Sequence, residues 1–486
     1  MKRHADFANS IFAKSPTDPT ETLRRNVSRT VDVTKAQLQQ YIGDPLTNYL
    51  EISNLMNALY HGNGIIKNTI RYNSSVLTLN HMIVPRLNEK IYEMSTVTQD
   101  EFIDATNFIE RFRIKRFAPH FIKQTLLNGY SLFYKMEDNT GVEYVEFPIR
   151  YGRIYSRENG VYRWAIDVDA IEDLAGDDAD PNLLPSEIAN AIGTNDRTGD
   201  DWLDETYFKL KDKGVAFCFD DEVLSNGGVA VSEFSHLIAS AIKVENARDK
   251  LEIKDNLDSI KLIHSKIPTD KDGKVQMTAT IADKYNQSMK RNLPPGIAAI
   301  TNPMTVTNVA LNGSGDSKAY ESVNRATEAL FNDVGTPQSM FGGSTASAQI
   351  TKLSNLKDIS WFYSFVIPVL DDYYTYEMSN FKSPSNLIWT VKILKQSIFT
   401  KSDDIKESDK QMSNGGSRLE NMAQTGYSPS ETIALLGLEQ NVLNIDSLML
   451  PKQSSHTMSG KSGVDGPGRP TSDNPSDDTD RINGAS

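Results

Sequence analysis

Two segments decide the fold: SEFSHLIASAIKVENARDKLEIKDNL, residues 232–257, and DSKAYESVNRATEALFNDV, residues 316–334. The first carries an apolar stripe at helical spacing, interrupted by Arg248 and formed by Phe234, Leu237, Ala241, Val244 and Leu251. The second carries a narrow seam at three- and four-residue steps, formed by Tyr320, Val323, Thr327, Leu330 and Val334. We therefore predict two long helices, the first roughly 39 Å long at about 1.5 Å per residue.

A compact unit separates these helices. Its pattern predicts a strand over residues 260–267, a turn at 270–273, a helix over 281–292, and strands over 297–301 and 305–311. The two long helices should form an antiparallel hairpin that carries this unit at its tip. Each helix has a thin apolar stripe, so we expect the hairpin to pack against copies of itself in a symmetric assembly. A coiled-coil hairpin projecting from a monomeric enzyme is the alternative.

The residues before this hairpin change from a helical to a β pattern. After a polar arm (1–30), helices are predicted over 48–60, 65–79, about 98–117, and from Pro119 to 128. Short alternating stretches then predict an antiparallel meander over 130–134, 142–148, 152–157 and 161–168. An acidic loop (177–201) precedes a strand pair within 206–219.

The residues after the hairpin are predicted to be mainly helical. A loop at 335–345 leads into a long helix over about 348–380, with a kink at Pro368. A strand is expected over 387–394. Three helices should follow over 402–413, 417–425 and 428–436, the last with Glu431 at the capping-box position. The tail, residues 451–486, has the composition of a disordered segment.

Composition limits the classes of function. The 486 residues suggest two to four domains, and the net charge of −13 argues against a protein that grips nucleic acid over its whole surface. One cysteine, Cys218, excludes an internal disulfide framework, and we expect it in the core of a strand. The sequence predicts neither a membrane-spanning helix nor a secretory signal.

Inspection of candidate motifs predicts no enzyme, cofactor or metal site. Residues 459–462 resemble part of a phosphate-binding loop, but its first glycine would fall at Ser455 and no strand precedes it. In residues 312–315 the glycines adjoin the serine, so this is not a nucleophile elbow. The acidic sets at 167/169, 177/178/180 and 220–222 could hold Mg²⁺, although solvated loops are the simpler interpretation.

Four features in order along residues 45–440 resemble the portal proteins of tailed phages that infect Gram-positive hosts. The first is YHGNGIIKN (60–68). The second is GYSLFY (129–134), followed by EFP (146–148) and GVYRWAID (160–167). The third is the hairpin with its insertion, and the fourth is GTPQSMFGG (335–343), which leads to WF (361–362) and PVL (368–370).

The resemblance implies an α+β portal fold with wing, stem, α/β clip and helical crown, in a ring of twelve copies. The expected division is an N-terminal arm (1–30), wing (31–231), stem helices (232–257 and 316–335), clip (258–315), tunnel loop (336–349), a kinked helix with a wing strand (350–400), crown helices (401–450) and a disordered tail (451–486).

The resemblance also implies partners and a place in the particle. The ring would occupy the unique capsid vertex of the virion, after assembly in the host cytoplasm, and serve as a conduit for genome packaging and ejection. Expected partners are double-stranded DNA passing through the channel, the large terminase, a head-completion or adaptor protein, and the major capsid and scaffolding proteins, with no membrane. Alternatives are another phage head protein, such as an adaptor or capsid protein, or a metal-dependent nuclease or phosphotransferase.

Three sets of residues are candidates for the site. The loop that would face DNA contains no Lys or Arg and comprises Thr336, Gln338, Ser339, Met340, Phe341, Gly342, Gly343, Ser344 and Thr345. A duplex slides past an acidic lining but is held by a basic one, and the candidate lining acids are Asp255, Asp258, Asp316, Glu321 and Glu328. An ordinary solvated helix face is the alternative for these acids. The clip surface for partners would comprise Lys271, Lys274, Lys284, Lys290 and Arg291.

Overall fold

A computed structural model describes residues 35–86, 99–138, 141–175, 185–194, 196–259, 261–272, 274–292, 297–302, 316–335 and 359–443. Contacts divide the chain into two units, Met1–Thr432 and Ile433–Ser486. The arm (1–30), the predicted strand at 305–311, the loop at 336–349 and the tail (451–486) lie outside the described residues.

The described part of the first unit begins with three helices, of which the first was not predicted and the other two follow the predicted order. They are α3 (Lys35–Gly43), α4 (Tyr49–Gly62) and α5 (Gly64–Ser75). Asn63 lies between the last two and caps α5, its Oδ1 accepting the N–H groups of Ile65 at 2.9 Å and Ile66 at 3.2 Å. The prediction that this helix reaches residue 79 is wrong. The Thr78 N–H donates instead to the Gln396 carbonyl, and the chain enters β1 (His81–Pro85), a strand the sequence did not indicate.

The boundary between the next two helices differs from the predicted one, which lay between residue 117 and Pro119. Helix α6 (Gln99–Glu110) ends before Arg113, whose φ is +47°, and α7 (Ile114–Asn128) begins directly after it. Pro119 therefore lies inside α7 and does not start it. The left-handed backbone of Arg113 cannot continue a helix, so it ends the helical run there. A proline one turn into a helix interrupts it less, and the boundary therefore falls at Arg113 and not at Pro119.

The central sheet contains β2 (Tyr130–Asp138), β3 (Gly141–Phe147), β4 (Gly152–Glu158), β5 (Val161–Asp167), β6 (Tyr207–Lys209) and β7 (Gly214–Cys218). The pairings are antiparallel as predicted, but the simple meander is wrong. The strand order is β3-β2-β7-β5-β4, with β6 beside β5. The two hairpins are thus joined through β7, which comes later in the chain.

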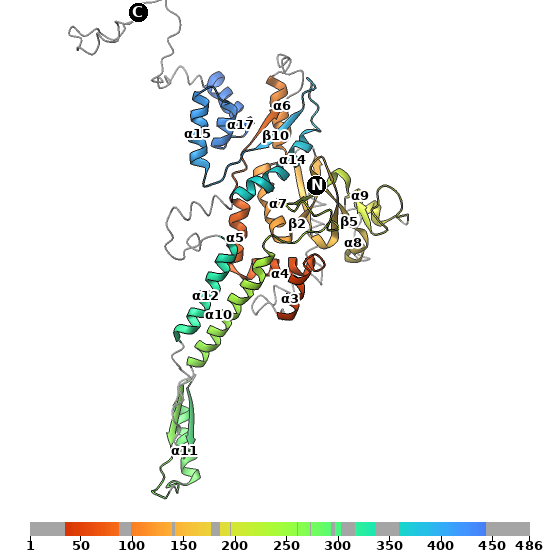
Figure 1. The fold of residues 1–486 in the computed structure, drawn as a ribbon. Helices are drawn as coiled ribbons and strands as arrows, with labels where there is room; N and C mark the ends of the chain where they lie inside the picture. The colour runs from red at the N-terminus through yellow and green to blue at the C-terminus, as the bar shows by residue number, and fades with distance from the viewer. Residues whose placement is uncertain are drawn as a thin grey trace, which may run out of the picture. The chain divides into compact units, whose positions relative to one another are not determined.

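Both faces of this sheet are buried, because alternate side chains enter two different cores. Phe133, Val215 and Phe217 pack in one core with α7 and α14 (Ile367–Met378). Leu132, Tyr134, Ala216 and Cys218 pack in the other. Helices α8 (Val168–Ala175) and α9 (Ser186–Ile192) cover the second core, so the predicted acidic loop contains a helix (Figure 1). Packing on both sides explains why β2 is buried from Tyr130 to Met136 and β7 is buried throughout.

Helix α14 holds a second, two-stranded sheet. A π-helical turn, η7 (Phe362–Val366), directly precedes α14. This turn lies next to Pro368, where a kink is predicted. Strand β1 pairs with β10 (Trp389–Ile393), His81 opposite Ile393. Two α14 side chains bond the other edge of β10: Thr375 Oγ1 accepts the Val391 N–H at 3.1 Å, and Asp371 Oδ1 accepts the Ile393 N–H at 2.7 Å. The helix thereby satisfies backbone groups that an edge strand otherwise exposes.

A buried ion pair joins α14 to the central sheet. Lys135 Nζ of β2 lies 2.7 Å and 2.6 Å from the two carboxylate oxygens of Glu377, with side chains 8% and 1% exposed. Burial raises the pKa of Glu377, while the Lys135 ammonium opposes that rise. Beside it, the fully buried Arg163 stacks on Tyr376 at 4.5 Å and reaches Asp212.

The long helix pair confirms the predicted hairpin. Helix α10 covers Ile238–Ser259 and α12 covers Asp316–Val334, and the two run side by side (Figure 1). The bounds of α12 are those predicted. The start of α10 is six residues later than predicted, because Ser235–Leu237 forms a 3₁₀ turn and Ser232 Oγ donates to the Leu126 carbonyl at 2.6 Å.

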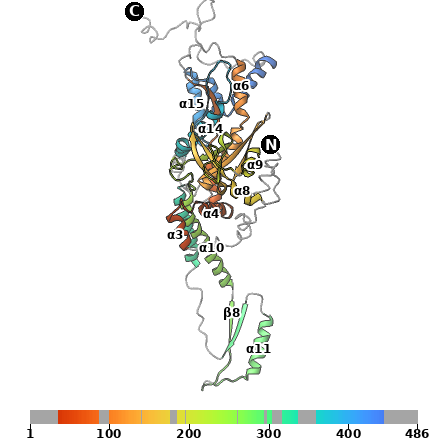
Figure 2. The same cartoon turned by 90° about the vertical axis from the view of Figure 1, so that its right-hand side faces the viewer.

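The unit inserted between these helices contains β8 (Lys261–Lys266), α11 (Ala279–Asn292) and β9 (Ile297–Asn302). The two strands are parallel, with α11 alongside them (Figure 2). A parallel pair needs a crossover, and α11 provides it, so the predicted strand–helix–strand order is confirmed.

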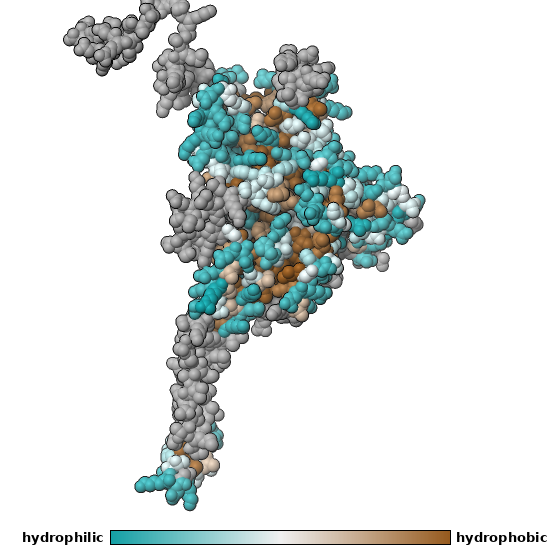
Figure 3. Space-filling view, in the orientation of Figure 1, coloured by the Kyte–Doolittle hydropathy of each residue, from teal (hydrophilic) through white to brown (hydrophobic). Residues whose placement is uncertain are grey.

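Three helices end the described chain: α15 (Lys401–Ser413), α16 (Arg418–Thr425) and α17 (Pro429–Gly437). The predicted capping box is present, since the Ser428 N–H donates to Glu431 Oε2 at 2.8 Å and the Glu431 N–H donates to Ser428 Oγ at 3.3 Å. Hydrophilic side chains cover α15 on the face shown in Figure 3. In the second unit, the π-helical turn η8 (Leu438–Val442) follows α17.

Candidate functional site

The end of the α10–α12 pair nearest the sheet is anchored in a core. Leu237, Ile238, Ala241 and Val244 are buried with Leu330 of α12 against side chains of α4 and α5. At roughly 25 cal/mol per Å² of apolar surface, such residues supply most of the free energy that holds the pair to the rest of the unit.

Polar contacts fix this anchored end. Ser240 Oγ donates to Asp333 Oδ2, and His236 Nε2 lies 3.3 Å from the Asp333 carbonyl oxygen. Asn63 Nδ2 donates to Glu245 Oε1 at 2.8 Å, joining α10 to the cap of α5. The direction in which the pair leaves the unit is therefore set by side chains from several elements.

Outside this anchored end, the described part of the α10–α12 pair has no core of its own. In the part of α10 and α12 whose side chains are described, no residue of 245–252 or 320–329 is buried. Tyr320 is 56% exposed, and of the predicted seam only Leu330 is fully buried. A helix pair with so little burial needs further contacts to be stable. The expectation of a thin, underpacked hairpin is thus confirmed for this half.

The predicted lining acids are not brought together by any contact of the described chain. Glu321 and Glu328 are exposed on α12, and Glu321 Oε1 lies 2.5 Å from Arg325 Nη2. Exposed pairs of this kind contribute about 0.5 kcal/mol or less. Asp255, Asp258 and Asp316 belong to the two helices, but their side chains lie outside the described residues. The loop residues Thr336 to Thr345 also lie outside.

The inserted unit presents basic and apolar side chains together. Lys271, Lys274, Lys284 and Arg291 are exposed as expected, whereas the Lys290 side chain is not described. Val275, Ile281 and Tyr285 are 46%, 46% and 64% exposed, a feature the prediction missed. The i, i+4 spacing of Ile281 and Tyr285 was the available signal, since Ala282 is the residue that faces inward.

Several carboxylates of the predicted acidic sets are paired or hydrogen-bonded within the chain. Asp169 pairs with Arg197, and Asp221 pairs with Arg157 at 3.2 Å. Asp167 Oδ1 accepts the Ala170 N–H at 2.9 Å, whereas Asp177, Asp178 and Asp180 lie outside the described residues. Within the described ranges no cluster of three or more His, Cys, Asp or Glu side chains could hold a metal ion.

Cys218 lies in the core as predicted. Its side chain is 1% exposed in β7, and burial raises the pKa of its thiol to about 12. A thiol with so high a pKa is a poor nucleophile at neutral pH. Among the described helices, none is long and apolar enough to span a membrane.

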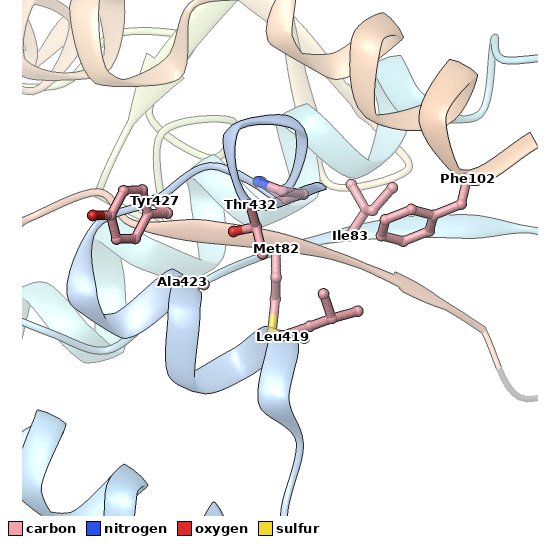
Figure 4. A pocket seen from close by; sticks show the side chains of 8 residues that line it. Met82, Ile83, Phe102, Leu419, Ala423, Tyr427 and Thr432 are labelled. Carbon is pink, nitrogen blue, oxygen red and sulfur yellow. The ribbon is translucent and has the colours of Figure 1, made fainter. Parts of the chain in front are cut away.

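A small apolar pocket lies where α16 and the start of α17 meet β1 and α6 (Figure 4). Met82, Ile83 and Phe102 form one side, and the lining on the other side is Leu419, Ala423, Tyr427, Pro429 and Thr432. Polar contacts surround it: Lys115 Nζ donates to the Gly426 carbonyl at 2.7 Å, and Asn80 Nδ2 donates to Gln396 Oε1 at 2.7 Å. The pocket marks a junction between elements and carries no group suited to catalysis.

Comparisons with known proteins give matches among solved structures only. No protein-family model and no curated protein matches the chain. The chain is similar to a chain in "Virion of native gene transfer agent (GTA) particle", at 12% identity and a TM-score of 0.40, covering 79% of this chain and 94% of that chain. It is also similar to a chain in "Neck of native GTA particle computed with C12 symmetry", at 10% identity and a TM-score of 0.39, covering 79% and 94%. A third match is in "Neck of empty GTA particle computed with C6 symmetry", at 12% identity and a TM-score of 0.42, covering 80% and 93%.

Proposed function

We propose that this protein is a portal subunit: a non-enzymatic ring component at one vertex of a tailed-phage capsid. The observation that carries the proposal is the α10–α12 pair, which is anchored at one end and leaves 245–252 and 320–329 without a buried side chain. Copies of the same pair packed side by side would cover this surface. Identical subunits related by one rotation close into a ring.

In this proposal the described elements take the parts that the sequence resemblance implies. The central sheet and its helices form the wing, α10 and α12 form the stem, and β8, α11 and β9 form the described part of the clip (258–315). Helices α15 to α17 belong to the crown. The clip would meet the terminase during packaging and the head-completion protein afterwards, and the proposed ring number is twelve.

The proposed channel would guide DNA without holding it. Each phosphate that a Lys or Arg neutralises adds affinity and slows movement, so an acidic or neutral lining favours sliding. Glu321 and Glu328 are exposed and available for such a lining. Energy for translocation would come from a separate ATPase.

Electron microscopy of the purified full-length chain, with light scattering for mass, tests this proposal. We expect closed rings with a central hole. Tyr320→Glu should abolish the ring while leaving the circular dichroism spectrum unchanged, since this side chain is 56% exposed in one copy. Leu224→Glu, a similar change at a 42% exposed position on the loop after β7, is the matched control and should leave rings intact. A wild-type chain that remains a single compact copy at assembly concentrations refutes the proposal.

A further inference from the structure

Among the described residues, positive charge without a carboxylate partner gathers where α4, α5 and α7 meet. Tyr60 lies in the last turn of α4, and the Lys123 Nζ of α7 lies 4.9 Å from the centroid of its ring. The positive charge of Arg71, on α5, lowers the pKa of the same tyrosine hydroxyl. The three helices contact one another, as Figure 1 shows. Two cations from different helices therefore act on one tyrosine side chain, Lys123 over its ring and Arg71 through its charge.

Several other arginines of the described residues are paired with carboxylates. Arg153, Arg157, Arg163 and Arg197 each lie within ion-pair distance of an aspartate. In the described part of the chain, no ion pair with a carboxylate is formed by Arg71, Lys123 or Lys67. Glu146, on the strand after β2, is bonded to His120 and Gln124.

The arrangement is held in place by the fold. Tyr60 is 6% exposed, so its ring is packed, while Arg71 is exposed and Lys123 and Lys67 are half-buried. The two cations hold the pKa of the Tyr60 hydroxyl below its usual value although burial alone would raise it. The C-terminal end of α4 favours cations nearby, which offsets part of their mutual repulsion. An anion bound between the two cations would offset the remaining repulsion.

We propose that Arg71, Lys123 and Tyr60 bind a phosphate group of a nucleic-acid backbone. A guanidinium, an ammonium and a hydroxyl supply several hydrogen-bond donors, and the guanidinium fork matches the geometry of a phosphate group. Lys67 lies one turn from Arg71 on α5 and extends the positive strip toward a neighbouring phosphate. A polymer with repeated phosphates is therefore the ligand class that uses all four residues.

This inference concerns one subunit's own side chains and stands whether or not a ring forms. It places a local holding point for DNA on the helices beside the sheet, apart from the exposed acids of α12. Ring formation, seen by microscopy, and DNA affinity are separate readouts, so failure of one proposal is distinguishable from failure of the other.

Fluorescence anisotropy with a labelled 30-base-pair duplex over a NaCl series tests the site with the full-length chain. The double variant Arg71→Gln/Lys123→Gln should bind about tenfold more weakly, and the slope of log affinity against log salt should become shallower by about one, the value for one lost phosphate contact. Lys382→Gln/Lys410→Gln removes the same charge from two exposed positions elsewhere and is the matched control. We expect its slope to equal that of the wild type.

Further variants and competitors identify the chemical group that the site binds. Arg71→Lys keeps the charge and should keep the salt slope, while melting curves establish that each variant folds. Inorganic phosphate at millimolar concentration should compete with the duplex, whereas polyglutamate of equal charge should compete poorly. Equal losses in the two double variants, no binding by the wild type, or competition by polyglutamate as strong as by DNA would each overturn the proposal.

Discussion

Breaking the Lys135–Glu377 pair from one side should destabilise the unit strongly. The two side chains are 8% and 1% exposed, and both carboxylate oxygens lie within 2.7 Å of the ammonium nitrogen. Lys135→Met leaves Glu377 in the core without its cation, at a cost of about 3–5 kcal/mol. Lys135→Met/Glu377→Leu removes both charges, and we expect its free energy of unfolding to equal or exceed that of the wild type by up to about 4 kcal/mol, because the pair's own desolvation cost also disappears.

The assay is urea denaturation followed by the fluorescence of tryptophan, since Trp164 is fully buried in the same sheet and its Nε1 donates to the Phe133 carbonyl at 2.8 Å. The pH dependence gives an independent check. Loss of Lys135 removes an influence that lowers the pKa of Glu377, so this pKa rises further above its unfolded value. A carboxyl with a raised folded pKa loses stabilisation as pH rises through that pKa. Lys135→Met should therefore be less damaging at pH 5 than at pH 8. A single-variant loss below about 1 kcal/mol, or a double-variant loss equal to the sum of both singles, refutes the reasoning.

Three further predictions follow from other contacts. Burial raises the pKa of Asp371 to about 7, so the wild type should lose up to about 4 kcal/mol relative to Asp371→Asn as pH rises from 4 to 8; a difference that stays constant with pH in urea titrations contradicts this. Gly228→Ala should lower the melting temperature much more than Gly227→Ala: both positions have positive φ, but an added Cβ at 228 would lie 1.9 Å from the Ile154 carbonyl oxygen and at 227 would meet nothing within 4 Å. Equal shifts for the two glycine variants would remove the steric argument. Millimolar Mg²⁺ should leave the melting temperature unchanged, whereas a clear rise would favour the metal-dependent nuclease alternative.

Local signals predicted the elements well, because their causes lie within a few residues. The bounds of α12 follow from its apolar spacing, and the start of α17 follows from the Ser428–Glu431 capping box. Pro119 misled the prediction because proline is tolerated near a helix start, while the left-handed Arg113 that ends the preceding segment has no strong sequence signal.

Long-range pairing was not predictable in the same way. Strand β1 has only five residues and exists because β10 lies beside it, and β7 enters between β2 and β5 although neither is its neighbour in sequence. The convergence of Arg71 and Lys123 on Tyr60 likewise depends on how three helices pack. Periodicity marks which face of a helix is buried, but it does not indicate which distant segment covers that face.

The β1–β10 pairing has a consequence for synthesis of the chain. Residues 81–85 leave the ribosome long before residues 389–393, and everything between them, including the long helix pair, emerges while the first strand still lacks its partner. Strands that wait in this way expose unpaired backbone and are prone to join the wrong chain. Closure of this small sheet must therefore come late, so that translation of the segment through β10 precedes completion of the core that Ile83, Trp389 and Val391 share with α7 and α14.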